Sequence, residues 1–170
     1  MSEVGGMRTA ADAHAVAATV VDPELPVLTI AELGILRDVR LEAGSVEVDI
    51  TPTYTGCPAL EAIRADVKAA LRTAGAREVH VRTVLSPAWT TDLISPEGRQ
   101  KLAEHGIAPP SPHGPPRSRG ESPVLVELSV RCPRCGSADT RELSRFGPTP
   151  CTALLSCRGC GEPFEHVKTL

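Results

Sequence analysis

Two pairs of cysteines in the last third of the chain have the spacing of a metal site. Cys132 and Cys135 form the first pair, Cys157 and Cys160 form the second, and a glycine directly follows each pair. Such a turn points backbone N–H groups at the first thiolate, while the glycine takes a backbone angle that other residues resist. Four thiolates make a closed tetrahedral ligand set for Zn²⁺, so the sequence predicts a zinc ribbon. Tetrathiolate sites also hold iron or iron–sulfur clusters, so the residue types leave the metal open.

Cys151 is a fifth cysteine beside this set. One alternative joins it to both cysteines of the second pair and to one cysteine of the first pair, in a different metal site. The two complete pairs favour the site without Cys151, which is then either a packed thiol or a functional spare. We expect His166 on a strand surface rather than among the ligands.

Cys57 is a different kind of cysteine, because it closes a threonine-rich loop and precedes a helix predicted to begin at Pro58. Unpaired N–H groups and the helix dipole favour a thiolate at such a position, so we expect a lowered pKa and a reactive thiol. The hydroxyls of Thr51, Thr53 and Thr55 can donate to an anion, a sulfide or a metal-bound thiolate. The alternative is a small buried cysteine beside ordinary strand threonines, and spacing alone leaves both interpretations open.

The composition argues against several classes of function. The 170 residues include 18 Lys and Arg and 21 Asp and Glu, a net charge of −3, so we expect no nucleic-acid partner. We expect neither a secretory signal nor a membrane span, which needs about 20 apolar residues, and reduced metal-binding thiols then favour the cytoplasm. The sequence has no nucleophile–base pair, di-iron carboxylate pattern, or flavin or ferredoxin motif. We therefore do not expect the chain to be catalytic by itself.

The elements that must position these cysteines fall into two predicted modules. Residues 1–107 are predicted to form a small α-β-β-α-β domain with a terminal helix, its helices and strands covering 8–20, 35–41, 45–51, 58–74, 79–83 and 96–104. Residues 108–123 contain six prolines and are predicted to be an extended linker. Residues 124–170 are predicted to form an antiparallel ribbon with short strands over 124–130, 140–144, 152–156 and 164–167. The small core of this ribbon makes metal binding a large part of its folding free energy, about 10 kcal/mol or more.

Trp89, the single tryptophan, has two interpretations. In the first, it is a core anchor that covers the predicted sheet. In the second, it is an exposed docking residue for a partner protein. The residue type leaves both open, because tryptophan is common in cores and in interface hot spots.

Three runs of sequence form a distinctive set: DPELPVLTI at residues 22–30, TPTYTGCP at residues 51–58 and LSPAWTTD at residues 85–92. They resemble the iron–sulfur assembly family that includes SufT and the MIP-type targeting factors, and its PaaD branch in particular. The C-terminal cysteine ribbon is a further likeness to this branch, whose members belong to the phenylacetyl-CoA 1,2-epoxidase system. The resemblance implies an α+β fold, in which a small α-β-β-α-β domain precedes a C-terminal antiparallel zinc ribbon.

The resemblance also implies a functional cluster made of Asp22, Glu24, Thr53 and Cys57. In this cluster Cys57 binds a transient iron–sulfur cluster or iron, while Zn²⁺ is structural in the ribbon. Relatives often have threonine where this chain has Tyr54, so we assign that hydroxyl no role. Carboxylates near Cys57 oppose thiolate formation unless a metal or a proton intervenes.

The implied function is that of an accessory or maturation subunit of the phenylacetyl-CoA epoxidase complex in aerobic phenylacetate catabolism. The implied partners are the oxygenase and reductase subunits of that complex and iron–sulfur assembly proteins, and a homo-oligomer stays open. The first alternative is a structural subunit of the same complex that handles no metal in transit. The second alternative, a redox enzyme that uses Cys57, lacks a resolving cysteine nearby in the sequence.

Overall fold

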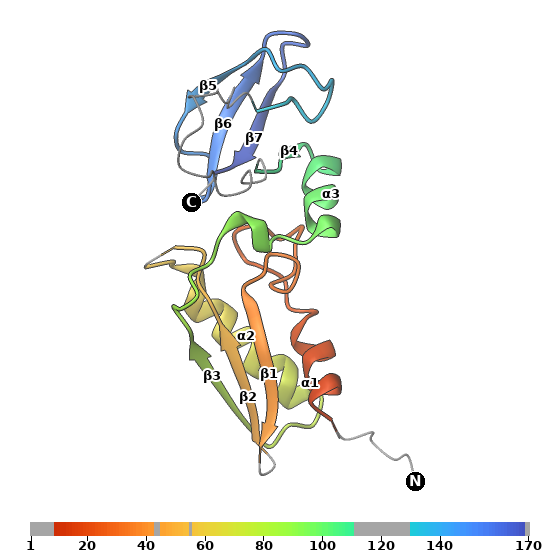
Figure 1. Ribbon diagram of the computed structural model, residues 1–170, viewed down its shortest axis with the longest axis vertical. Coiled ribbons are helices and arrows are strands. Elements are labelled where there is room, and N and C mark those ends of the chain that lie inside the picture. Colours follow the sequence, from red (N-terminus) through yellow and green to blue (C-terminus); the bar gives the residue numbers. More distant parts are fainter. Residues whose placement is uncertain (1–8, 43–44, 55, 111–129, 169–170) are drawn as a thin grey trace, which may run out of the picture. The chain divides into compact units, whose positions relative to one another are not determined.

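The computed structural model describes residues 9–42, 45–54, 56–110 and 130–168. It divides into two compact units, Met1–Gly98 and Arg99–Leu170, and each unit contains its own sheet (Figure 1). Most of the predicted linker, residues 108–123, and nearly all of the predicted strand at 124–130 lie outside the described residues. The boundaries given to the two modules and to the linker therefore stay a prediction.

The first unit has the predicted α-β-β-α-β order. Its elements are α1 (Ala10–Ala17), β1 (Leu36–Glu42), β2 (Ser45–Ile50), α2 (Ala59–Thr73), β3 (Glu78–Thr83) and the short 3-10 helix η1 (Thr91–Leu93). The strands lie in the order β1-β2-β3, with β1 and β2 antiparallel and β2 and β3 parallel. The parallel pair is possible because α2 carries the chain back across the sheet.

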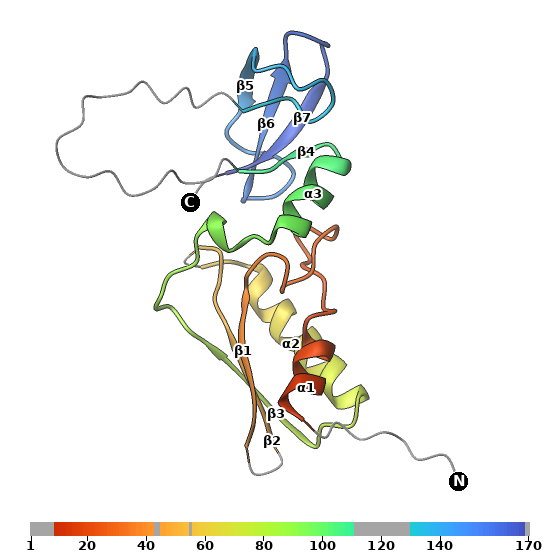
Figure 2. The same ribbon diagram turned by 45° about the vertical axis from the view of Figure 1, so that its right-hand side comes forward.

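Both helices of this unit cover the same face of the three-stranded sheet (Figures 1 and 2). Val46, Val48 and Ile50 alternate along β2, and each is at most 1% exposed. Ile63, Val67 and Leu71, spaced by four along α2, are equally buried. This combination of periods is that of a helix packed on a sheet. The core of the unit therefore lies between the sheet and the two helices.

The opposite face of the sheet is polar. Asp49 of β2 accepts a hydrogen bond from Arg40 of β1 at 2.9 Å and two from Arg82 of β3 at 3.0 and 3.2 Å. These bonds, from Arg40 first and Arg82 second, hold the pKa of Asp49 below its usual range. The two arginines of this face are therefore already paired with a carboxylate.

The carboxyl ends of β2 and β3 lie at the same edge of the sheet, because the two strands are parallel. The backbone N–H of Val84 donates to the carbonyl of Ile50 at 2.8 Å, which continues the pairing beyond β3. Trp89 lies in the loop that follows, is 7% exposed, and donates from Nε1 to the carbonyl of Leu33 at 2.8 Å. The burial of Trp89 confirms it as a core residue and contradicts the interpretation as an exposed docking residue, while its place over the sheet stays a prediction.

Gly34 explains why the loop before β1 is so closely packed. Its backbone angle φ is +71°, and an added Cβ would lie 2.5 Å from the Cβ of Leu93. No side chain fits at that distance, and a positive φ is itself unfavourable for residues other than glycine. Glycine at this position therefore permits the contact between the segment before β1 and η1.

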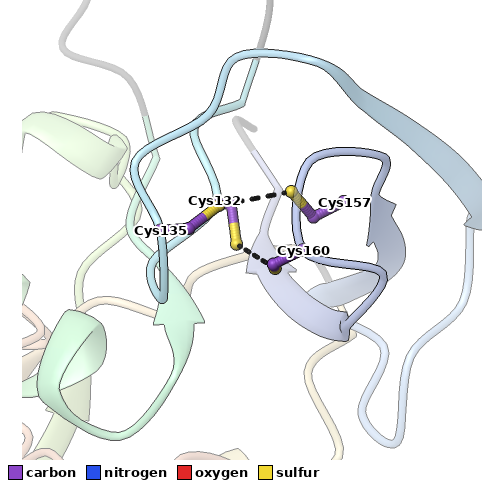
Figure 3. Close-up of side chains that lie close together, drawn as sticks. All are labelled: Cys132, Cys135, Cys157 and Cys160. Atoms are coloured by element: carbon purple, nitrogen blue, oxygen red, sulfur yellow. Dashed lines mark hydrogen bonds between the residues drawn. The ribbon is translucent and has the colours of Figure 1, made fainter.

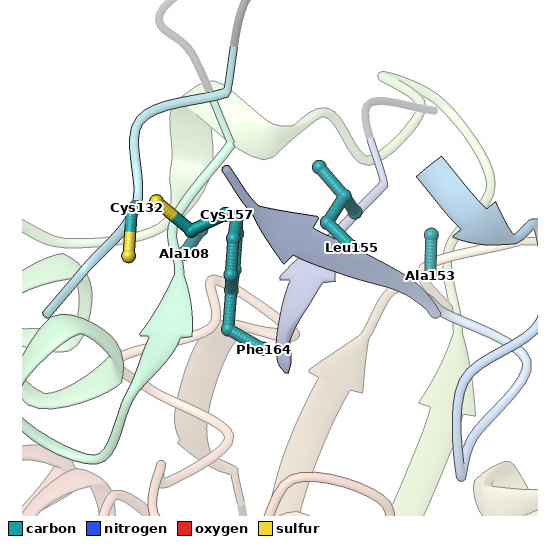
Figure 4. Close-up of a cluster of buried hydrophobic side chains, with 6 residues drawn as sticks. All are labelled: Ala108, Cys132, Ala153, Leu155, Cys157 and Phe164. Carbon is teal, nitrogen blue, oxygen red and sulfur yellow. The ribbon is translucent and has the colours of Figure 1, made fainter. Parts of the chain in front are cut away.

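The second unit contains the ribbon. Its sheet has the order β4-β7-β6-β5, built from β4 (Ile107–Ala108), β5 (Thr140–Ser144), β6 (Thr152–Cys157) and β7 (Pro163–Val167). Strands β5, β6 and β7 are antiparallel, as predicted, whereas β4 was not predicted and pairs parallel to β7. The core is small, as Figure 4 shows, and its buried members are Ala108, Cys132, Ala153, Leu155, Cys157 and Phe164. Two of these residues are cysteines of the metal pairs, so the core and the metal site are continuous.

Helix α3 (Pro96–Glu104) precedes β4, as the Ser95-Pro96-Glu97 start signal predicts. Ser95 begins it, because its hydroxyl accepts the N–H of Gly98 at 3.0 Å. Among the described residues, no helix combines the length and the apolar character that crossing a membrane requires.

Candidate metal centre and the Cys57 site

The four cysteines of the two pairs gather at one point (Figure 3). Their sulfur atoms all lie within 4.8 Å of one another. The sulfurs of Cys132 and Cys160 are 3.8 Å apart, and those of Cys135 and Cys157 are 3.5 Å apart. The first cysteine of each pair is buried and the second is exposed. The arrangement therefore has one protected and one solvent-facing thiol on each turn.

The two turns have the same backbone hydrogen bonds. The N–H of Gly136 donates to the carbonyl of Cys132, and the N–H of Gly161 donates to the carbonyl of Cys157, both at 2.9 Å. Both glycines have a positive φ, +75° and +79°. In the second turn the backbone N–H of Cys160 points at the Cys157 sulfur and, as the largest cause, lowers the pKa of that thiol to about 7. The predicted N–H groups aimed at the first thiolate are therefore present in this turn.

The donor set fits a structural metal ion. Four sulfurs from two rigid turns leave no position open for water or substrate, which is the character of a structural rather than a catalytic zinc site. Zn²⁺, when bound, supplies four strong bonds that hold the two turns together. Thiolates also suit iron, so the ligands show a metal-binding site without selecting the metal.

Cys151 and His166 lie outside this group of ligands. Cys151 is buried, and its sulfur is 3.1 Å from the hydroxyl oxygen of Thr149, so it is a packed thiol. His166 is half-buried on β7, with Nδ1 3.2 Å from the carbonyl oxygen of Ala108, and burial lowers its pKa. The alternative metal site that includes Cys151 is thus not formed among the residues that the structure describes.

Cys57 lies two residues before α2, at the end of the loop that leaves β2. Its N–H donates to the carbonyl of Tyr54 at 3.3 Å, and its own carbonyl accepts the N–H of Leu60 at 3.3 Å. The thiol is half-buried. The structure thus places Cys57 beside the first turn of a helix, as the sequence predicts.

The pKa of Cys57 is raised, not lowered, so that expectation is wrong. Burial is the largest cause, and the carboxylates of Glu24 and Asp22 raise the pKa further. A hydrogen bond from the backbone N–H of Ala59 and one from Thr53 favour the thiolate, but they are outweighed. The helix start was visible in the sequence, whereas the burial of the sulfur was not.

The side chain of Asp22 caps the turn that it begins. One carboxylate oxygen, Oδ1, accepts the N–H of Glu24 at 2.9 Å and the N–H of Leu25 at 2.7 Å. Asp22 is 5% exposed, and burial raises its pKa against the opposing effect of these two bonds. The Asp-Pro-Glu-Leu run is therefore a self-capped turn that fixes a buried carboxyl group.

The residues implied by the resemblance come together in space. Asp22, Glu24 and Thr53 all act on the thiol of Cys57, and the two carboxylates are 29 or more residues away from Thr53 and Cys57 in the chain. They do not form a compact ligand set. Within the described ranges, only the four ribbon cysteines bring three or more ligating side chains close enough for one ion.

Two family models match separate parts of the chain. Residues 11–82 match the family described as iron–sulfur cluster assembly protein, and residues 117–168 match the PaaD zinc beta ribbon domain. The putative 1,2-phenylacetyl-CoA epoxidase D subunit of Escherichia coli (strain K12) is 42% identical over 149 residues, which is 88% of this chain and 86% of that protein.

Further similarities cover the first module. An Fe-S protein maturation auxiliary factor of Porphyromonas gingivalis is 35% identical over 86 residues, 49% of this chain and 81% of that protein. A crystal structure of a DUF59 domain of unknown function from Bacillus anthracis has a TM-score of 0.52 and 30% identity, covering 55% of this chain and 90% of that one. The Fe-S maturation factor and the DUF59 domain thus match about half of the chain, whereas the Escherichia coli subunit matches most of it.

Proposed function

Since this chain belongs to the PaaD family of 1,2-phenylacetyl-CoA epoxidase subunits, we propose that it is an accessory subunit of such an epoxidase in the cytoplasm. In this proposal it assists the assembly of the iron–sulfur or iron centre of the complex during aerobic phenylacetate degradation. The supporting observation is that the Escherichia coli epoxidase subunit matches 88% of this chain, whereas the Fe-S maturation factors match 49% and 45% of it. The first of these relatives is described as an epoxidase subunit and the others as auxiliary factors, which supports an accessory role for this chain.

In the proposed mechanism Cys57 contacts iron or a cluster that is passing to the epoxidase. At rest, burial and the two carboxylates of Asp22 and Glu24 keep the thiol protonated, since they raise its pKa. The same carboxylates attract an arriving cation, and the cation reverses their effect on the thiol. Thr53 then donates a hydrogen bond to the sulfur. The thiolate thus forms when metal is present and is protonated again when metal leaves.

The ribbon has a structural part in this proposal. Zn²⁺ at the four cysteines contributes folding free energy to a unit whose described core is small. A ribbon folded in this way scaffolds the chain or docks it onto the epoxidase. The oxygenase and reductase subunits and iron–sulfur assembly proteins are the proposed partners.

The epoxidase is produced in cells that contain the wild-type chain, the Cys57→Ser variant or the Cys151→Ala variant. The iron content and the activity of the three epoxidase preparations are then compared. The Cys151→Ala variant is the control, because it also removes one thiol, at a packed position in the other unit of the chain. We expect Cys57→Ser to fold and to give epoxidase subunits with less iron per subunit, and Cys151→Ala to give full iron. Full iron and full epoxidase activity with Cys57→Ser would rule out the metal-handling role.

A structural subunit that handles no metal in transit is the second candidate. It is favoured by the open spacing of Cys57, Asp22 and Glu24, which do not form a compact metal site among the described residues. Co-purification separates the two candidates. If this second function holds, Cys57→Ser leaves the amount and the iron content of the complex unchanged, whereas Cys132→Ser in the ribbon loses the oxygenase subunits.

A further inference from the structure

Helix α2 has a shallow groove on its solvent side, and the lining of this groove includes no residue of the ribbon or of the Cys57 site. The hollow has a volume of about 340 Å³, and its lining comes from this helix alone: Glu61, Arg64, Ala65, Lys68, Ala69 and Arg72. Ala65 and Ala69 form its floor, one turn apart. Because alanine side chains are short, another backbone can approach this part of the helix closely.

Three cations follow the groove at intervals of four residues. Arg64, Lys68 and Arg72 lie on one side of α2, about 6 Å apart per step along the axis. Arg64 is partly engaged, since it donates to the hydroxyl of Thr83 and its Nε lies 3.7 Å from a carboxylate oxygen of Glu61. In the described part of the chain, Lys68 and Arg72 have no ion-pair partner.

The stability of the isolated helix does not explain this row of charges. Like charges four residues apart destabilise a helix by a few tenths of a kcal/mol, and a solvated helix face usually alternates its charges. The helix dipole accounts for Arg72, which is in the last turn, but not for Lys68 in the middle of the helix. The chain as a whole carries a net charge of −3, so the row does not follow from a basic composition.

We propose that this groove docks an acidic helix of a partner protein. Carboxylates repeating every fourth residue on the partner would face the three cations, and the alanine floor admits the partner's backbone. The charge pattern favours a short acidic helix over a phosphate polymer. The cations are confined to a line of about 12 Å, and the carboxylate of Glu61 stands in the same groove. The arginines on the open sheet face, in contrast, are already paired with Asp49.

The groove begins close in sequence to Cys57, so the proposed docking brings the partner near this residue. Cys57 lies two residues before α2, and the groove begins at Glu61, in the first turn of this helix. A helix docked along α2 therefore has one end near the loop that carries Cys57. The docking itself does not require that Cys57 binds metal, so the two proposals fail separately.

The test uses the full-length chain and a synthetic helical peptide of about 18 residues with glutamate at every fourth position of an alanine face. A peptide with glutamine at those positions is the control ligand. Lys68→Glu with Arg72→Glu reverses the two unpaired charges. Arg141→Glu with Arg145→Glu, both exposed on the ribbon, changes the net charge equally and is the control variant.

We expect the glutamate peptide to bind the wild-type chain, to bind less tightly as ionic strength rises, and to shift amide resonances of α2. The reversal at positions 68 and 72 should weaken binding by about tenfold or more, and the ribbon reversal by about twofold at most. If the charge reversal prevents folding, Lys68→Gln with Arg72→Gln replaces it, with the same direction of effect.

Three results would overturn the docking proposal. The first is equal binding of the glutamine peptide, and the second is an equal loss in both reversal variants. The third is failure of the glutamate peptide to bind while anionic vesicles or single-stranded RNA bind through Lys68 and Arg72. None of these results depends on the iron content of an epoxidase, so each is distinct from a failure of the proposed function.

Discussion

The buried turn at Asp22 yields a prediction that separates a structural from an electrostatic role of its carboxylate. In Asp22→Ala the N–H groups of Glu24 and Leu25 lose the acceptor that they contact at 2.9 and 2.7 Å. At about 1 kcal/mol net for each bond, and more for a donor left buried, the loss is about 2–3 kcal/mol of unfolding free energy. Asp22→Asn keeps an oxygen at the same position and should lose less than about 1 kcal/mol.

The same pair of variants has a defined pH dependence. Burial raises the pKa of Asp22 in the folded chain above its ordinary value of 3.8, so folding favours the protonated carboxyl. The contribution of the carboxyl to stability is therefore fully present below pH 3.8 and is lost as pH rises through the raised pKa. Because asparagine does not titrate, Asp22→Asn should gain stability relative to the wild type over that same rise in pH.

Urea unfolding followed by Trp89 fluorescence measures these differences, because Trp89 is the single tryptophan and is buried in the first unit. The electrostatic role has its own measurement, the rate at which Cys57 is alkylated at fixed pH. Neutralising Asp22 removes one of the influences that raise the Cys57 pKa, so alkylation should be faster in Asp22→Asn. An Asp22→Ala variant as stable as the wild type would contradict the structural role of the carboxylate, and unchanged alkylation in Asp22→Asn would contradict its electrostatic effect on Cys57.

Three further predictions concern single contacts and the metal. Gly34→Ala should lower the free energy of unfolding by about 2–4 kcal/mol, because this position combines a positive φ with a 2.5 Å contact of the added Cβ. Gly56→Ala has open space around its Cβ and should lose about 1 kcal/mol. Chemical denaturation compares the two variants. Trp89→Phe should cost about 1–3 kcal/mol, measured by circular dichroism, since the buried carbonyl of Leu33 loses its donor. Removing metal with a chelator should abolish hydrogen-exchange protection in β6 and β7 while Trp89 fluorescence stays native; protection that survives chelation would contradict a structural metal.

Local patterns were sufficient to predict most of the fold. The alternation of Val46, Val48 and Ile50 identified β2, and the four-residue spacing of Ile63, Val67 and Leu71 identified α2. Strand β4 escaped prediction because two residues carry no period and their partner on β7 is 58 residues further along the chain. Pairing of that kind depends on the folded arrangement and leaves no local signal.

The candidate sites were predictable to different degrees. The spacing of the paired cysteines was enough to identify the tetrathiolate, because each turn fixes its own geometry. The direction of the Cys57 pKa was not predictable from spacing, because burial by the surrounding loops outweighs the helix N-terminus. The three basic residues of α2 stand at positions 64, 68 and 72 of the sequence. The groove between them, with Ala65 and Ala69 in its lining, can be identified only once the solvent side of the helix is known.

Anomalous scattering from crystals of the full chain tests directly whether Cys57 binds iron at a site separate from the ribbon cysteines. The protein is purified without oxygen, loaded with iron, and measured at the iron and zinc absorption edges. We expect an iron peak about 2.3 Å from the sulfur of Cys57, with a separate metal peak among the four ribbon cysteines. Iron found only at the ribbon cysteines, with none at Cys57, would contradict it.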